Sequence, residues 1–410
     1  MKISLKPFWR RGSESGNGAG AALLGAGALR WLRPTQAPAV EPDSALEWPD
    51  TQPHQHSEHA QAIYGATLQA LAARPQESLA LSIRLPFCAA HCLFCDRDIH
   101  AAQPSDAIGR YVEALASEVA LLAQHVGGGR DVLQLHLGGG SANEMSEPQL
   151  IRLVETLRSA WRLPADAEMS VECDPRRVTR QHLDTLQGLG FRHVTFGVGD
   201  LDSTVQQAIG RCNSPALIDD VCTTAREVGF ERIRLELLIG LPGQSESSWR
   251  STLARLVAIG PHRVALSDYR HQPYLWPAQQ AIDHDALPDP GLCDALRSLS
   301  RQALQAAGYT AIDDQLYVLD DDELALAQPV GQLRRTLLGP TATPEAPLLG
   351  LGAGAIGEID GTRFWNLSAL RDWHAALQSQ QLPVARAQGS RAAAALRAGD
   401  SNGAAPRWLS

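Results

Sequence analysis

Three cysteines fall within eight residues of this chain, at Cys88, Cys92 and Cys95. Four cysteines normally hold a cluster of four irons, so three thiolates would leave one iron open to another ligand. A closed structural zinc site needs a fourth protein ligand nearby. His91 is a candidate for that ligand, but it adjoins Cys92, where the backbone makes convergence on one ion awkward. The spacing therefore favours an iron–sulfur cluster, with structural zinc and three unconnected thiols as the alternatives.

Other residues with possible chemistry follow apolar runs further along the chain. Three glycines, Gly138 to Gly140, precede Ser141 and would let the backbone approach a ligand closely. A side chain at Gly140 is therefore expected to impair binding of that ligand while leaving the metal content intact. Glu172 ends another apolar run and could accept hydrogen bonds from a ribose, although a solvated or helix-capping carboxylate is the alternative. Glu236 lies inside an apolar run, where an acid needs a partner.

These runs are the strands of an alternating pattern that positions the candidate residues. Six strand and helix units predict a parallel sheet, and their number favours a partial, open (β/α)6 barrel in an α/β fold. The carboxyl ends of parallel strands meet at one edge of the sheet, where the candidate residues would lie together. The expected strands cover residues 79–85, 132–137, 168–173, 191–198, 232–239 and 263–267, and the expected helices cover residues 59–73, 147–162, 179–189, 215–228 and 246–258.

Composition divides the chain into four segments. Residues 1–57 are rich in Gly, Ala and Pro and are expected to form a flexible extension. Arg10 and Arg11 before an apolar stretch loosely imitate an export signal, so export is the alternative for this segment. We expect the barrel domain with its N-terminal helix at 58–275, a smaller and mainly helical C-terminal domain at 276–384, and a disordered tail at 385–410.

Charge and cysteine content limit the possible partners and compartment. The formal net charge of −9 provides no basic surface for nucleic acid, so no nucleic-acid partner is expected. No stretch is long and apolar enough to predict a membrane span. An odd number of cysteines, three of them clustered, is typical of a reducing compartment, and we expect a cytoplasmic protein.

The Cys88, Cys92 and Cys95 spacing, with Phe94 before the last cysteine, resembles that of radical S-adenosylmethionine (SAM) enzymes. The chain is further similar to the oxygen-independent coproporphyrinogen III oxidases from about residue 79 to residue 383. Stretches that carry this likeness are Leu85-Pro86-Phe87-Cys88, Leu135-His136-Leu137-Gly138-Gly139-Gly140, Glu172 to Pro175, Gly240 to Gln244, His271-Gln272-Pro273 and Leu348-Leu349-Gly350-Leu351-Gly352.

The resemblance implies a 4Fe–4S cluster on the three cysteines and one or two molecules of SAM. It places SAM at Phe94, Gly139, Gly140, Ser141, Glu172, Arg211, Glu236 and Ile356. The implied reaction is radical oxidative decarboxylation of the propionates of a tetrapyrrole, coproporphyrinogen III, in haem biosynthesis. Flavodoxin or ferredoxin is the implied electron donor. Arginines suit carboxylates, so Arg84 and Arg270 are candidates to bind the substrate.

Several positions depart from the family pattern. Where the family has tyrosine, histidine and a fourth cysteine, this chain has Ser82, Arg84 and Arg97. Gly199 replaces a glutamine, and Glu236 replaces an aspartate. These changes affect the second cofactor site and the substrate contacts. Two alternatives to the oxidase therefore stay open: a tetrapyrrole carrier or regulator that has lost turnover, and a radical SAM enzyme with another substrate.

Overall fold

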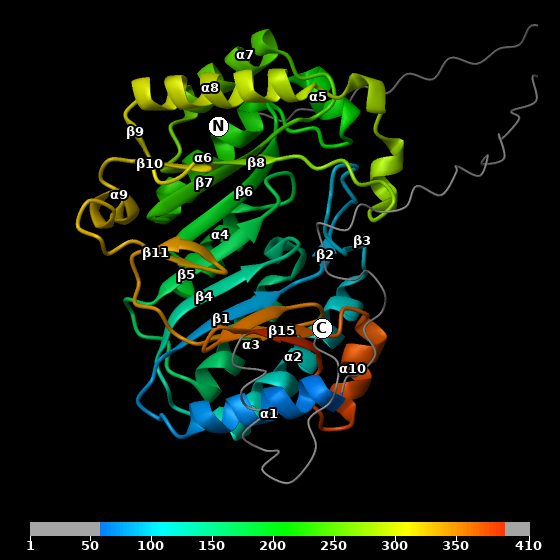
Figure 1. Ribbon diagram of the computed structural model, residues 1–410, viewed down its shortest axis with the longest axis vertical. Coiled ribbons are helices and arrows are strands. Elements are labelled where there is room, and N and C mark those ends of the chain that lie inside the picture. Colours follow the sequence, from blue (N-terminus) through cyan, green and yellow to red (C-terminus); the bar gives the residue numbers. More distant parts are fainter. Residues whose placement is uncertain (1–57, 390–410) are drawn as a thin grey trace, which may run out of the picture. The chain divides into compact units, whose positions relative to one another are not determined.

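The computed structural model describes residues 58–389, which belong to one compact unit (Figure 1). The expected N-terminal extension, residues 1–57, lies outside the described residues, as does the expected tail from residue 390 onward. None of the helices in residues 58–389 is long and apolar enough to cross a membrane.

A partial barrel forms the centre of this unit. Six strands are hydrogen-bonded in the order β1-β4-β5-β6-β7-β8, and every neighbouring pair is parallel. The sheet is open, with β16 and β9 at its edges. These strands confirm the predicted fold class and agree with the predicted segments to within about two residues. They are β1 (Leu79–Arg84), β4 (Val132–Gly138), β5 (Glu168–Cys173), β6 (His193–Gly199), β7 (Arg232–Ile239) and β8 (Arg263–Asp268).

Helices pack beside one another along this sheet, in sequence order from α1 to α8 apart from the short α5 (Figure 1). The helix α2 was not predicted, although its buried residues Ile108, Leu115, Val119 and Leu122 recur at spacings of three, four and seven. The helices are α1 (Glu58–Ala72), α2 (Ser105–Val126), α3 (Glu147–Ala160), α4 (Arg180–Gly188), α5 (Ser203–Ala208), α6 (Pro215–Val228), α7 (Glu246–Ile259), α8 (Pro290–Ala306), α9 (Glu323–Ala327) and α10 (Leu370–Gln378).

The segment after β8 differs from the mainly helical domain that we expected. It contains α8 to α10, but it also adds β9 (Tyr309–Ala311) and β10 (Leu316–Leu319) to one edge of the main sheet. At the other edge β13 pairs in parallel with β1, and β14, β15 and β16 follow antiparallel. Both expected domains thus share one sheet, and the boundary at residue 275 stays a prediction. The remaining strands are β11 (Arg334–Thr336), β12 (Gly339–Thr341), β13 (Leu348–Leu351), β14 (Ile356–Ile359), β15 (Thr362–Asn366) and β16 (Val384–Gly389).

The last of these strands also corrects the expected tail. Residues 385–389 belong to β16, where Gly389 pairs with Thr362 and Gln388 with Arg363. A Cβ at Gly389 would lie 2.7 Å from the carbonyl oxygen of Gly361, so only a glycine fits this close pairing. The alanine-rich composition that suggested disorder continues beyond this strand.

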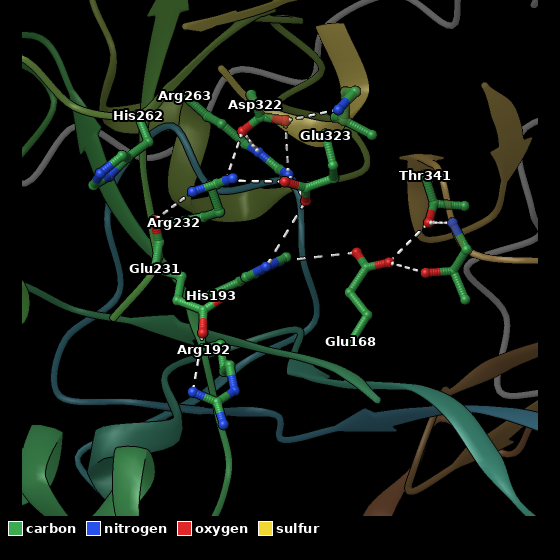
Figure 2. A network of polar contacts seen from close by, with 12 residues as sticks. Glu168, Arg192, His193, Glu231, Arg232, His262, Arg263, Asp322, Glu323 and Thr341 are labelled. Carbon is green, nitrogen blue, oxygen red and sulfur yellow. Dashed lines mark hydrogen bonds and ion pairs between the residues drawn. The ribbon is translucent and has the colours of Figure 1, made fainter. Parts of the chain in front are cut away.

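Charged side chains join the amino-terminal ends of the barrel strands (Figure 2). Arg263 at the start of β8 binds both carboxylate oxygens of Asp322, at 2.7 and 3.0 Å, and also contacts Glu323. His193 at the start of β6 lies 3.9 Å from both Glu168 and Glu323. Because parallel strands begin at the same edge, this network lies at the end of the barrel opposite the candidate site. It connects the barrel to the segment that carries α9.

Glu323 makes this network sensitive to acid. Burial would raise its pKa, but Arg263, His193 and Arg232 outweigh burial and lower the pKa from 4.5 to about 2. A carboxyl with a depressed folded pKa contributes stability above its unfolded pKa, and that contribution is lost as the pH falls from 4.5 toward 2. We therefore expect Glu323→Gln to lower the free energy of unfolding near neutral pH, and the difference to shrink below pH 4.5. Urea unfolding at several pH values, with the exposed Glu345→Gln as control, measures this; a constant difference would contradict it.

Candidate functional site

The three clustered cysteines line one cavity of about 280 Å³ at the carboxyl ends of the barrel strands. After β1, the short strand β2 (Phe87–Cys88) pairs with β3 (His100–Ala101), and the other two cysteines lie in the loop between them. The backbone N–H of Leu93 donates to the carbonyl of Ile209 at 3.1 Å. Gln279 donates its side-chain amide to the carbonyl of Phe94 at 3.1 Å. The loop is thus fixed by contacts from distant parts of the chain.

Polar groups surround the cysteine sulfurs. Arg211 donates to the sulfur of Cys92 at 3.2 Å, and Arg176 approaches the same sulfur at 3.8 Å. Ser141 lies 3.7 Å from the sulfur of Cys88. Burial raises the pKa of Cys88 to about 11 and that of Cys95 to about 12. The thiolates of Cys88 and Cys95 therefore need a bound metal to persist near neutral pH.

The residues present fit an iron–sulfur cluster. In the part of the chain that the structure describes, no three His, Cys, Asp or Glu side chains are grouped as the ligands of a single metal ion would be. A cluster instead takes one thiolate on each iron, so three thiols around one cavity suit it. The Nε of Arg211 is buried and has no hydrogen-bond partner among the described residues. This donor is available for an anionic group of a cofactor in the cavity.

The glycines after β4 shape the wall of the cavity. Gly139 has φ +93°, which favours glycine, and its N–H donates to the carboxylate of Glu172 at 3.1 Å. At Gly140 an added Cβ would lie 2.4 Å from the carbonyl oxygens of both Leu85 and Phe87. A side chain at Gly140 would therefore collide with the backbone that leads to Cys88. This corrects our expectation that such a side chain would enter only the cofactor's space.

We accordingly expect Gly140→Ala to lower both the iron content and the affinity for SAM. Displacing the Leu85–Phe87 backbone should also destabilise the fold by roughly 1–3 kcal/mol, as overpacking usually does. Iron analysis after anaerobic reconstitution, SAM binding and thermal unfolding measure the three effects. Gly188→Ala is the control, because a Cβ there meets nothing within 4 Å. Normal iron content with weakened SAM binding would restore the original expectation.

Glu172 already has strong partners within the described residues. Its carboxylate accepts from Arg97 at 2.8 Å, and its other oxygen lies 3.5 Å from Nε2 of His136. Burial would raise the pKa of Glu172, but the charge of Arg97 and the contacts with His136 hold it well below the ordinary range. The carboxylate is thus ionised and able to accept further hydrogen bonds. The pair could not be predicted from sequence, because Arg97 and Glu172 are 75 residues apart.

Most of the predicted site residues meet in this cavity, but two do not. Arg84 and Ile356 line a second cavity, which shares Arg97, Gly139 and Glu172 with the first. Asp174, the carboxylate directly after β5, is 2% exposed and binds Arg176 at 2.6 Å. The predicted residues that line the first cavity, hereafter the cluster cavity, are Cys88, Cys92, Phe94, Cys95, Gly139, Gly140, Ser141, Glu172, Arg211, Glu236 and Arg270.

Three residues of the site were not predicted. Arg176 approaches the sulfur of Cys92 and forms an ion pair with Asp174. Its position two residues after Asp174 is the one sequence signal of that ion pair. Arg234 binds Glu236 at 2.7 Å on the same face of β7 and is the partner that an acid in an apolar strand required. Tyr269 lines the cluster cavity and shares a hydrogen bond of 2.8 Å with His271. No pattern of spacing in the sequence indicated Tyr269.

Comparison with known proteins agrees with this geometry. The model of the Radical SAM superfamily matches residues 82–256. Oxygen-independent coproporphyrinogen III oxidase from Escherichia coli is 33% identical over 315 residues, which are 77% of this chain and 69% of that protein. The Synechocystis sp. enzyme of the same name is 33% identical over 75% of this chain and 66% of its own length. The solved structure of the Escherichia coli enzyme aligns with a TM-score of 0.76, 33% identity, and coverage of 79% of this chain and 74% of that one.

The fold and the cysteine site define a radical SAM protein, with a 4Fe–4S cluster and SAM as its cofactors. The chain belongs to the oxygen-independent coproporphyrinogen III oxidase family. It spans about two thirds of the length of the curated relatives that it matches. The family resemblance predicted from sequence is therefore confirmed.

Proposed function

We propose that this chain is a radical SAM oxidoreductase that converts propionates of coproporphyrinogen III to vinyl groups. The observation that carries the proposal is the meeting of three cysteines with Gly139, Glu172 and Arg211 around one cavity, in a chain 33% identical to curated oxidases. When bound, the cluster and SAM supply a 5′-deoxyadenosyl radical that removes a hydrogen atom from the substrate. Loss of carbon dioxide and of one electron to an acceptor then completes the vinyl group.

The residues of the chain position these reactants. Cys88, Cys92 and Cys95 would hold the cluster, and Arg211 would stabilise negative charge on the Cys92 sulfur. Glu172 is ionised and faces the cavity, where it would accept hydrogen bonds from a ribose. Arg270, two residues after β8, lines the same cavity and would bind a substrate carboxylate. A reducing cytoplasm, a flavodoxin or ferredoxin as electron donor, and the absence of a nucleic-acid partner complete the proposal.

Formation of 5′-deoxyadenosine tests the function. Reconstituted, reduced protein is expected to cleave SAM faster when coproporphyrinogen III is present and to release carbon dioxide. Cleavage that the tetrapyrrole does not accelerate would favour another substrate. No cleavage at all, with the cluster intact, would contradict the enzyme.

One contact favours a second candidate, a tetrapyrrole carrier or regulator that no longer turns over. Arg97 already binds, at 2.8 Å, one oxygen of the carboxylate that the proposal assigns to the SAM ribose. Gly199, where the family has glutamine, has φ +81°, so a restored side chain there would be strained. The family residues could be restored by Ser82→Tyr and Gly199→Gln together. The backbone strains the second of these changes, whereas Ser82 lines the second cavity. A carrier would bind the tetrapyrrole without cleaving SAM.

A further inference from the structure

Two guanidinium groups approach the same cysteine sulfur from different parts of the chain. Arg211, in the segment between α5 and α6, donates to the sulfur of Cys92 at 3.2 Å. Arg176, in the loop between β5 and α4, places its Nη2 atom 3.8 Å from that sulfur. Arg176 was not predicted from the sequence, and the proposed function gives it no task. Its position beside a cluster ligand therefore needs an explanation.

The other two clustered cysteines have weaker surroundings. The sulfur of Cys88 lies 3.7 Å from the hydroxyl of Ser141, and the sulfur of Cys95 lies 3.9 Å from the backbone carbonyl oxygen of Arg97. Among residues 58–389, Cys92 is thus the one clustered cysteine whose sulfur accepts from a charged donor. Charge-assisted hydrogen bonds are the strong ones, so the positive charge is concentrated on one ligand of the three.

A buried carboxylate holds both arginines in place. Asp174 is 2% exposed, binds Arg176 through Nη2 at 2.6 Å and Nε at 3.0 Å, and lies 3.5 Å from Arg211. Its backbone N–H donates to the side chain of Asn143 at 2.9 Å, which fixes the carboxylate in turn. Burial would raise the pKa of Asp174, but the hydrogen bond from Arg176 and the charge of Arg211 outweigh burial and lower it. The two cations and one anion leave an excess of one positive charge beside Cys92.

A purely structural ion pair is the simpler explanation for Arg176, but its neighbour shows what such a pair looks like. Arg177 is 61% exposed at its side chain and lies 3.8 Å from Glu144. The side chain of Arg176 is only 20% exposed. It stands close to a second guanidinium, an arrangement that like-charge repulsion disfavours unless negative charge gathers between them. The sulfur of Cys92 lies where that negative charge would be.

Reduction of a 4Fe–4S cluster would supply such a charge. It adds one electron, taken from a low-potential donor, and no proton, so the cluster and its thiolates together gain one negative charge. A cation near a ligand sulfur stabilises the reduced form more than the oxidised form. Hydrogen bonds to the sulfurs and the net charge nearby are among the factors that set the reduction potential of these clusters.

We propose that Arg176, held by Asp174, is a positioning residue that acts through the Cys92 sulfur and raises the reduction potential of the cluster. The assignment rests on the radical chemistry of the proposed function, since the cluster must be reduced before SAM is cleaved. It does not depend on which substrate the radical attacks. Arg176 thereby helps a donor of ordinary low potential to deliver the electron.

A redox titration of the reconstituted protein tests the assignment. The protein is titrated anaerobically with dithionite and mediators, without SAM or tetrapyrrole, and the visible absorption and electron paramagnetic resonance of the cluster are followed. We expect Arg176→Gln to lower the equilibrium constant for reduction by about tenfold, which moves the potential of this one-electron couple by about 59 mV to more negative values. Arg176→Lys keeps the charge and should shift the potential less. Iron content should stay unchanged in both variants.

Arg177→Gln is the matched control, because it removes the same charge one residue along the chain from a side chain without a hydrogen bond to a sulfur among the described residues. It should leave the potential unchanged. Asp174→Asn removes the negative charge between the arginines and should shift the potential in the opposite direction, to more positive values. This variant also decides the question if Arg176→Gln does not retain its iron.

Three results would overturn the assignment: an unchanged potential in Arg176→Gln, an equal shift in Arg177→Gln, or a potential in Asp174→Asn that is unchanged or more negative. Because the titration contains no tetrapyrrole, failure of coproporphyrinogen III as the substrate would not alter its outcome. An unaltered chain that binds no cluster would refute the proposed function and this assignment together.

Discussion

Replacing Cys88, Cys92 or Cys95 with alanine is expected to abolish the iron–sulfur cluster. Anaerobically reconstituted protein should contain about four irons and four sulfides per chain, and each variant should contain close to none. The reason is that the three thiols are the only protein ligands that the loop brings to the cavity, and one iron already depends on SAM. Losing one thiolate leaves two irons without a protein ligand. Iron and sulfide analysis, together with the visible absorption of the cluster, measures the result.

Cys173 is the decisive control for this experiment, because it also borders the cluster cavity. Neighbouring residues on a strand point to opposite faces, and Glu172 faces the barrel interior. The sulfur of Cys173 therefore faces away, and Cys173→Ala should keep a full cluster. Cys212→Ser, at an exposed position, should do the same. A full cluster in any variant of the three clustered cysteines would refute their assignment as ligands.

The barrel strands could be predicted from the sequence, since each is an apolar run bounded by glycines or charged residues. β5 and β7 begin and end where the sequence predicted. The helix α2 has an equally clear apolar spacing and could have been predicted in the same way. The strands β13 to β15 are four or five residues long and carry no alternation that distinguishes them from loops. They form strands because β13 pairs with β1, more than 260 residues earlier in the chain.

The cysteine loop and the glycines could likewise be predicted, because local spacing specifies them. The division of the predicted residues between two cavities could not. It depends on the ion pair between Arg97 and Glu172 and on how the segment around Ile356 packs against Arg84. A Cβ at Gly354 would lie 3.0 Å from the Arg84 guanidinium, a contact between two segments 270 residues apart. Such contacts arise from the tertiary fold, and no short motif indicates them.

Replacing Arg263 with methionine is expected to cost about 3 kcal/mol of unfolding free energy, the low end of the roughly 3–5 kcal/mol typical of broken buried pairs. Arg263 is 9% exposed at its side chain, and Asp322 is 1% exposed. Without Arg263 the Asp322 carboxylate stays buried, and Arg232, at 3.1 Å, is its remaining cation among the described residues. Arg232 keeps the cost at the lower end. Urea unfolding measures the change.

A double variant separates the lost pair from lost packing. Asp322 also caps α9 by accepting from the N–H of Leu324 at 3.0 Å, and asparagine can keep that bond without the charge. Arg263→Met with Asp322→Asn should therefore be more stable than Arg263→Met alone, because no uncompensated charge is left buried. Arg363→Met, which breaks an exposed pair with Glu358, should cost no more than about 1 kcal/mol. Iron content should stay normal in all of these variants, since this network lies at the opposite end of the barrel. Equal losses of unfolding free energy in the single and double variants would show that packing, not charge, holds Arg263 in place.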